Sequence, residues 1–185
     1  MTDQVIAITA DEFETFIAQP QHQDRRFELI YGEIIEKHMP TEEHGVIMAQ
    51  IVIALGIYLK TNRIGRVGTE IRHRATVSDV RIPDISLTLA VDSPLITHGA
   101  VPRLPDLAVE VQSPDDHVLK LRAKAAFYLD NGCQVVWIVI PRHRLIEVYR
   151  PDHDVELVGI DGTLTGGDML PGFVLPVREV FEGVG

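Results

Sequence analysis

Two short apolar stretches separated by a helical segment constrain the fold of this chain most strongly. The stretches "DLAVEVQ" (106–112) and "QVVWIVI" (134–140) have the length and the apolar content of β-strands. Between them, Ser113 and Pro114 are suited to begin a helix and Gly132 is suited to follow its end. A strand, a helix and a strand in this order are expected to form a right-handed parallel crossover.

The N-terminal half of the chain adds further helices and strands. Thr9, with Glu12 three residues later, has the pattern of a capping box and predicts a short helix. Alternating apolar residues on both sides of Gly32 predict two strands. Thr41 can cap a long helix from about residue 42 to residue 60. This segment is apolar on most sides, so we expect it to lie buried against a sheet.

The remaining elements complete a mixed architecture. A strand is expected after Pro83, a hairpin over residues 144–160, and a short strand with a helical turn near the end of the chain. This order predicts an α/β (α+β) fold, in which helices flank a mixed β-sheet. A chain of 185 residues is large enough for one core, and we expect a single domain over residues 1–185.

Composition places the chain among ordinary globular proteins. Apolar residues make up 45% and charged residues 24% of the sequence. The single cysteine, Cys133, cannot form an internal disulfide. We find no signal-peptide pattern, and the longest apolar run (45–59) is shorter than the roughly 20 residues that span a bilayer. The sequence therefore predicts a cytoplasmic protein without a membrane segment.

The formal net charge of −10 narrows the possible functions. An acidic protein lacks the long-range field that attracts nucleic acid, which counts against a general DNA coat or repressor. The objection is weaker for a metal-dependent nuclease, because divalent cations offset its carboxylates. The sequence also has no H-x-x-x-H, C-x-x-C, G-x-x-x-x-G-K-[ST], G-x-G-x-x-G or G-x-S-x-G motif, which argues against zinc, nucleotide and serine-hydrolase sites.

Glu110 is an ionisable residue inside an apolar strand. A buried charge is costly unless it is paired or binds a metal. Side chains alternate along a strand, so Glu110 shares a face with Gln112 and opposes Val109. If the strand after Pro83 is a neighbour, Asp84 and Glu110 can point into the same space. Two carboxylates suit Mg²⁺ or Mn²⁺ better than zinc.

Lys124 is expected to reach the same space from the helix. It lies ten residues after Pro114, which is about 15 Å along a helix that begins there; the alternative is a helix that begins only near Val118. A crossover helix runs back along its strand, so this rise returns Lys124 to the level of the strand's middle. Side chains lean toward the helix N-terminus, which tips the lysine toward Glu110. Asp84, Glu110 and Lys124 are therefore predicted to converge.

These residues resemble a known family. Pro83-Asp84, followed twenty-six positions later by Glu110, resembles the P-D…(D/E)-x-K nuclease superfamily, whereas Pro105-Asp106 only begins the strand that carries Glu110. More closely, "FELIYGEI", "HGVIMAQ", "PDLAVEVQSPDD", "QVVWIVIP" and "LPGFVLPVREVF", in this order, resemble the Uma-type restriction-endonuclease-like family of bacteria. The resemblance extends from about residue 27 to residue 181.

The resemblance implies Mg²⁺-dependent hydrolysis of DNA phosphodiester bonds. Asp84 and Glu110 would hold the metal, and Lys124 would orient water or stabilise the developing charge. Gln112 stands where the superfamily motif has lysine, a position that the family moves to the following helix, and its amide could position water or metal. Glu33 matches an early acid that could complete the metal shell. Cleavage of both strands would suit a homodimer.

His44, at the start of the long helix, resembles another position near the site, although capping is the commoner use of such a residue. Trp137 is interpreted as a core residue.

Structural alternatives stand beside these functional interpretations. Glu110 could be paired with an arginine such as Arg72 or Arg74. Asp84 could bond local backbone amides, and Lys124 could be a solvated helix residue. The chain could therefore also be a non-catalytic or regulatory module that keeps the nuclease fold and acts through protein contacts.

Overall fold

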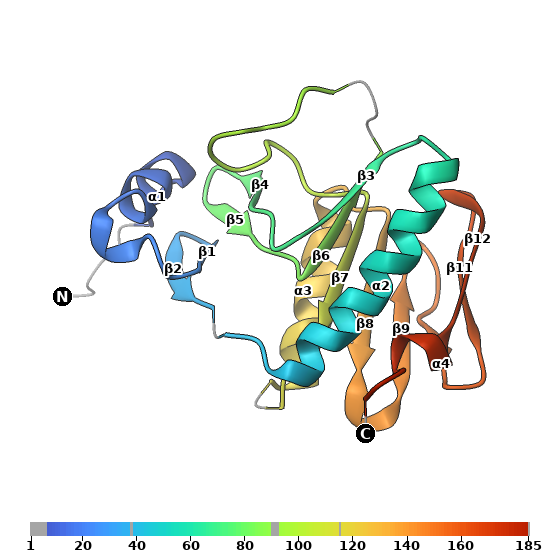
Figure 1. The fold of residues 1–185 in the computed structure, drawn as a ribbon. Coiled ribbons are helices and arrows are strands. Elements are labelled where there is room, and N and C mark those ends of the chain that lie inside the picture. Colours follow the sequence, from blue (N-terminus) through green and yellow to red (C-terminus); the bar gives the residue numbers. More distant parts are fainter. Residues whose placement is uncertain (1–6, 38, 90–92, 115, 185) are drawn as a thin grey trace. The chain divides into compact units, whose positions relative to one another are not determined.

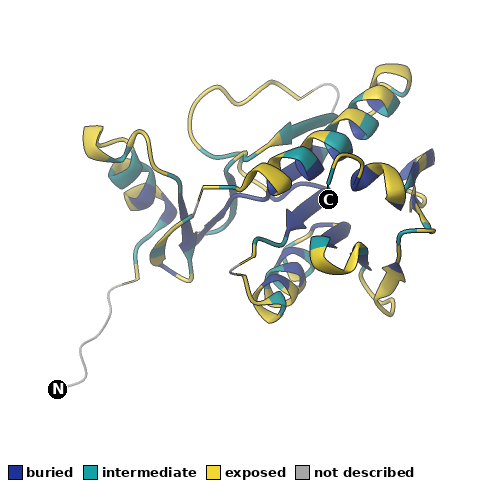
Figure 2. Cartoon of the chain, turned by 60° about the horizontal axis from the view of Figure 1, so that its bottom comes forward, coloured by how far each residue is buried: buried dark blue, intermediate teal, exposed yellow. Residues whose placement is uncertain are grey.

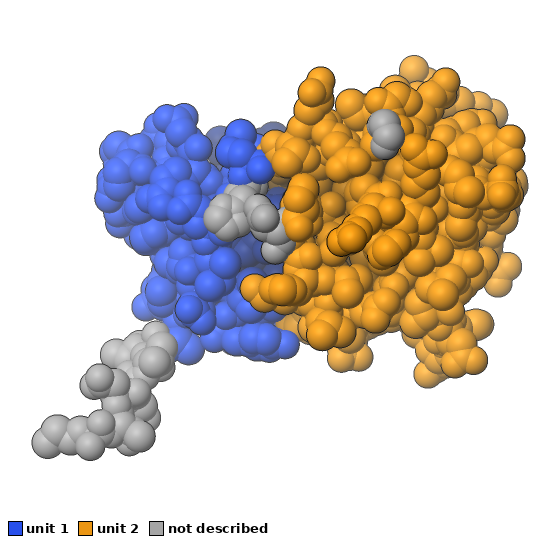
Figure 3. Space-filling model, turned by 90° about the horizontal axis from the view of Figure 1, so that it is seen from below, with its two compact units in different colours: residues 1–39, 71–82, 94–104 blue, residues 40–70, 83–93, 105–185 orange. Residues whose placement is uncertain are grey.

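A computed structural model describes residues 7–37, 39–89, 93–114 and 116–184. These residues divide into two compact units, which Figure 3 distinguishes by colour. Unit 1 draws on residues 1–39, 71–82 and 94–104, and unit 2 draws on residues 40–70, 83–93 and 105–185. The expectation of a single domain stays a prediction, and each unit is described by itself.

Unit 1 consists of short helices and an antiparallel sheet. The capping box predicted from Thr9 and Glu12 is present at the first helix, and Gly32 takes a positive φ of 79° at the turn between the first two strands. The four strands have the order β2-β1-β5-β4, and a small core around Phe13 and Leu29 packs on them. The elements are α1 (Ala10–Ile17), η1 (Pro20–His22), β1 (Phe27–Ile30), β2 (Glu33–Glu36), β4 (His73–Thr76) and β5 (Asp79–Arg81).

Unit 2 is built on a six-stranded mixed sheet of order β10-β9-β8-β7-β6-β3. The strands β7 and β8 are parallel and the other pairs are antiparallel, which confirms the predicted parallel pairing, the hairpin and the mixed sheet. The strands are β3 (Arg66–Thr69), β6 (Ile85–Thr88), β7 (Leu107–Val111), β8 (Val135–Ile140), β9 (Leu145–Tyr149) and β10 (Glu156–Val158).

The two long helices of unit 2 cover opposite faces of this sheet (Figure 1). The helix α2 (Glu42–Thr61) begins after its cap Thr41, as predicted, and α3 (Val118–Asp130) connects β7 to β8. The C-terminal part adds η2 (Pro141–His143), the hairpin β11 (Thr163–Gly166) and β12 (Leu170–Pro176), and α4 (Val177–Val180).

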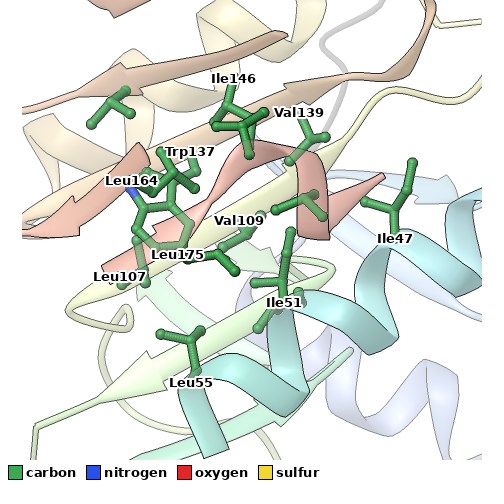
Figure 4. Close-up of a cluster of buried hydrophobic side chains, with 14 of the residues drawn as sticks. Ile47, Ile51, Leu55, Leu107, Val109, Trp137, Val139, Ile146, Leu164 and Leu175 are labelled. Carbon is green, nitrogen blue, oxygen red and sulfur yellow. The ribbon is translucent and has the colours of Figure 1, made fainter. Parts of the chain in front are cut away.

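The main core lies between α2 and the sheet (Figure 4). One stripe of α2, formed by Ile47, Ile51 and Leu55, is fully buried. It packs in one cluster with Val109 and the other alternate apolar residues of β7. Trp137 of β8 belongs to the same cluster and is 1% exposed, so it is a core residue as expected.

The helix α2 lies buried against the sheet on one side, as expected, but its other side is apolar and exposed. Ile53 and Ile57 are 56% and 62% exposed, and Figure 2 shows this outer side of the helix in yellow and teal. At 20 residues, the helix is also longer than the apolar run 45–59. Among the described residues, α2 is the one helix long and apolar enough to cross a membrane, a test that core helices of globular proteins also pass.

The helix α3 begins at the later of the two starts considered. The helix begins at Val118 with His117 at its N-cap position, not at Ser113. Ser113 and Asp116 instead close a turn, because the Ser113 backbone N–H donates to Asp116 Oδ2 and the Asp116 N–H donates to the Ser113 carbonyl. Gly132 follows the helix end with a φ of 98°, as expected for a residue that stops a helix.

A leucine pair measures how much the core contributes to stability. Leu55→Ala should lower the free energy of unfolding by about 2–5 kcal/mol, because Leu55 is fully buried and a cavity would remain. Leu119→Ala, at a 71% exposed position of α3, should change it by less than about 0.5 kcal/mol. Urea denaturation of both variants checks this, and equal losses would contradict the described core.

Candidate active site

Glu110 lies on β7 and Asp84 directly precedes β6, and these two strands are neighbours, the condition set for the two carboxylates to share one space. The antiparallel pairing of β6 and β7 ends with Ile85 opposite Val109, so Asp84 and Glu110 follow at the same end of the pair. The relative exposures of Asp84 and Glu110 are only 2% and 3%. Two buried carboxylates therefore lie at one end of the β6–β7 pair.

The Asp84 carboxylate is held from two sides. Its Oδ2 accepts a hydrogen bond from the backbone N–H of Val111 at 2.8 Å and lies 3.0 Å from His44 Nε2. The amide is thus supplied by the adjacent strand β7, not by the local turn. His44 takes part in the helix cap and also lies beside Asp84. Its backbone N–H donates to the Thr41 hydroxyl, and its ring contacts the Asp84 carboxylate.

The Glu110 carboxylate is held from α3. Its Oε1 accepts a hydrogen bond from the Tyr128 hydroxyl at 2.7 Å and lies 2.8 Å from Lys124 Nζ. Lys124 and Tyr128 are one helical turn apart, so both reach the same strand residue. The Lys124 side chain is only 13% exposed, which excludes the interpretation as a solvated lysine.

The arginines considered as alternative partners of Glu110 have other partners. Arg72 pairs with Glu14 at 3.5 Å and Arg74 pairs with Asp11 at 2.8 Å, all within unit 1. The lysine partner was thus predicted correctly although the helix begins at the alternative start near Val118. Lys124 lies six residues into α3, about 9 Å along the helix instead of about 15 Å.

Sequence reasoning missed Tyr128 and a second buried carboxylate, Glu147 of β9. The strand registers set Glu110 opposite Ile138 and Ile138 opposite Glu147, so the two glutamates lie in one row across the sheet. Arg122 of α3 donates to both oxygens of Glu147. An acidic residue inside the apolar strand "LIEVY" was a signal that could have identified Glu147, by the argument applied to Glu110.

The pKa values around Glu147 follow from burial and hydrogen bonding. Burial raises the pKa of Glu147, but hydrogen bonds from Arg122 and from Tyr149, at 2.6 Å, outweigh it and leave the pKa below its usual value. Burial and the neighbouring Glu147 raise the pKa of Tyr149 to about 12. At neutral pH, Glu147 is therefore a carboxylate and Tyr149 a hydroxyl donor.

Asp106 and Cys133 have structural roles. Asp106 Oδ2 accepts from the Leu89 N–H at 2.7 Å and Oδ1 accepts from the Gln134 amide at 2.9 Å, so the second Pro-Asp pair ties strand ends together. Burial raises the pKa of the Cys133 thiol to about 12. Cys133 is therefore a neutral thiol at physiological pH and does not supply a thiolate nucleophile.

Gln112 and Glu33 are not brought to the carboxylates by a described contact. The Gln112 amide donates to the Asp116 carbonyl at 2.9 Å. Glu33 is exposed on β2, in unit 1, so its place in a metal shell stays a prediction. Within the described ranges, no group of three or more His, Cys, Asp or Glu side chains is arranged to hold a metal ion.

Removing Lys124 tests whether its charge stabilises the buried Glu110 carboxylate. Lys124→Met should lower the free energy of unfolding by about 3–5 kcal/mol, because it leaves a buried carboxylate without its cation. The double variant Glu110→Gln/Lys124→Met should recover most of this loss. Lys120→Met, at an exposed position one turn earlier on α3, should change stability by less than about 0.5 kcal/mol. Similar losses in the two lysine variants, measured by urea denaturation, would contradict the pairing.

Glu147 should contribute to acid sensitivity. Its pKa is lower in the folded chain than in the unfolded chain, so its contribution to stability is present above the unfolded value near 4.5 and is lost as pH falls through the folded value. The stability difference between wild type and Glu147→Gln should therefore be largest near pH 7 and should shrink below about pH 4. Parallel pH–stability curves would show that Glu147 has no such role.

Comparisons with known proteins agree with this architecture. A family model described as "Uma2: Putative restriction endonuclease" matches residues 11–178. A solved structure described as a putative nuclease belonging to DUF820 from Anabaena variabilis ATCC 29413 is similar, with a TM-score of 0.79 and 27% sequence identity. The match covers 95% of this chain and 98% of that one. Curated proteins gave no match.

The family match includes the segments that carry Asp84, Glu110 and Lys124. The structural similarity confirms the expected restriction endonuclease-like fold, with a mixed sheet flanked by helices. The chain therefore belongs to the Uma2 family, described as putative restriction endonucleases, and is nuclease-like.

Proposed function

We propose that this chain is a Mg²⁺- or Mn²⁺-dependent endonuclease that hydrolyses DNA phosphodiester bonds, and that it acts in the cytoplasm. One observation carries the proposal. Buried Asp84 and Glu110 lie at one end of the neighbouring strands β6 and β7, and Glu110 is paired with Lys124. Membership of a family described as putative restriction endonucleases supports the same activity.

The donor set fits a hard divalent cation. Mg²⁺ takes oxygen ligands and is commonly bound by one or two carboxylates while it keeps several waters. Asp84 and Glu110 would hold the ion. When bound, such an ion polarises a phosphoryl oxygen and lowers the pKa of a water nucleophile.

The surrounding residues would hold these groups in position. His44 and the Val111 amide restrict the Asp84 carboxylate, and the Tyr128 hydroxyl restricts Glu110. Lys124 contributes a positive charge beside Glu110, where it would orient water or stabilise negative charge that develops on the phosphate. In this proposal, Gln112 assists through its amide, which in the described structure bonds to the Asp116 carbonyl.

A second candidate is a non-catalytic module with the nuclease fold. Two observations favour it: Gln112 stands at the usual lysine position, and the net charge is −10. The ion pair of Glu110 with Lys124 would then serve stability alone.

Plasmid nicking tests the proposed activity. With Mn²⁺ present, wild type should convert supercoiled plasmid to nicked or linear forms, whereas Asp84→Asn, Glu110→Gln and Lys124→Met should each be slower by about 100-fold or more. Each removes a group for which the proposed chemistry has no replacement. Glu147→Gln removes a buried carboxylate of the same sheet that is not assigned to the site, and Lys120→Met removes an exposed lysine of α3; both should cut like wild type.

Titration calorimetry with Mn²⁺ separates binding from chemistry. Wild type should bind the ion and Asp84→Asn should bind it at least about 10-fold more weakly. A wild type that neither binds Mn²⁺ nor cuts any plasmid would overturn the proposal in favour of the non-catalytic module. Equal cutting by all variants would remove these residues from the site.

A further inference from the structure

The outer side of α2 is an uncovered apolar face. No charged residue occurs between Glu43 and Lys60. The buried stripe of the helix packs on the sheet, but Gly45, Ala49, Ile53 and Ile57 are exposed. These four residues recur every fourth position and therefore lie along one side of the helix. We call them, together with the exposed Glu42 and Lys60, the α2 outer face.

The α2 outer face is symmetric in its spacing and complementary in its chemistry. Its six residues follow at intervals of three, four, four, four and three positions, which is symmetric about residue 51. The first half carries an acid and small residues, and the second half carries large apolar residues and a base. A second α2, running antiparallel, would set Gly45 against Ile57 and Ala49 against Ile53. It would also set Glu42 against Lys60 at both ends.

The fold itself gives no packing reason for glycine at position 45. A Cβ placed on Gly45 would meet no atom within 4 Å. Glycine inside a helix costs about 1 kcal/mol relative to alanine. A mainly apolar groove of about 300 Å³ lies beside this half of the helix, lined by Gly45, Met48, Ala49 and Val52 with Pro40, Thr69 and the charged Glu70. Space left open at Gly45 and Ala49 is what a large side chain from outside requires.

We propose that the α2 outer face binds a second copy of this chain in a two-fold symmetric, antiparallel α2–α2 homodimer. Ile53 and Ile57 of each copy fill the groove beside Ala49 and Gly45 of the other. The opposite charges at the two ends of the helix favour the antiparallel orientation and oppose the parallel one. The interface requires neither metal nor DNA, so it stands independently of the proposed nuclease activity.

Sedimentation velocity of the full chain tests the dimer. Wild type should sediment as a dimer at micromolar concentration, and Ile53→Glu should raise the dissociation constant by about 100-fold or more, because it places two charges in an apolar interface. Leu157→Glu is the matched control, since Leu157 is a 62% exposed apolar residue on β10, and it should remain dimeric.

Three further variants distinguish this interface from a loss of folding. Gly45→Leu should raise the dissociation constant at least about 10-fold while the free energy of unfolding, measured on dilute protein, does not fall, because leucine is the better helix former. Glu42→Lys should weaken the dimer, and the double variant Glu42→Lys/Lys60→Glu should restore it to within about threefold of wild type.

Several results would overturn the proposal. A wild type that stays monomeric at about 100 µM excludes the dimer. Its dissociation constant would then lie far above the micromolar range expected here. An Ile53→Glu variant that remains dimeric would place the dimer interface on another surface. A Glu42→Lys/Lys60→Glu variant that dimerises as weakly as Glu42→Lys would exclude the antiparallel orientation. Flotation of wild type, but not of Ile53→Glu, with phosphatidylcholine–phosphatidylglycerol vesicles would assign the face to a membrane instead.

Discussion

The ion pair between Glu110 and Lys124 joins the middle of a buried strand to the helix that follows it. A carboxylate at 3% exposure is tolerated in an apolar strand only when a partner compensates the lost hydration, and here α3 supplies both an ammonium group and the Tyr128 hydroxyl. Arg122 and Glu147 repeat the arrangement two strands away. The placement of α3 on the sheet therefore depends on charge as well as on apolar contact.

Side chains alternate along β7, so one face of the sheet is apolar and the other carries the charged Glu110. Leu107, Val109 and Val111 belong to the apolar core with α2, whereas Glu110 points to the face that carries α3. The Asp84 carboxylate, at the start of β6, bonds to the Val111 amide and to His44 of α2. The charged groups are thus concentrated where the β6–β7 pair ends. Hydrogen bonds hold the two carboxylates in position there, outside the apolar core.

The pairing of Glu110 with Lys124 was predictable because a local rule determined the geometry. A helix returning along its strand brings Lys124 to Glu110, and the β6–β7 pairing leaves Asp84 at the same end of these strands. The start of α3 was not predictable from Ser113, because a serine that can cap a helix can equally close a turn with Asp116. The exposed side of α2 could not be read from composition, since apolar residues occur on both sides of that helix and only packing decides which side is covered.

The environment of Cys133 has a practical consequence. The residue is 1% exposed, its sulfur lies within hydrogen-bonding distance of the Asp106 and Val135 carbonyls, and burial raises the pKa of its thiol to about 12. Maleimides and similar reagents attack the thiolate, which this residue scarcely forms at neutral pH. The native protein therefore behaves toward such reagents as a cysteine-free background. One cysteine introduced at a chosen surface position can carry a spin label or fluorophore without any change to the core.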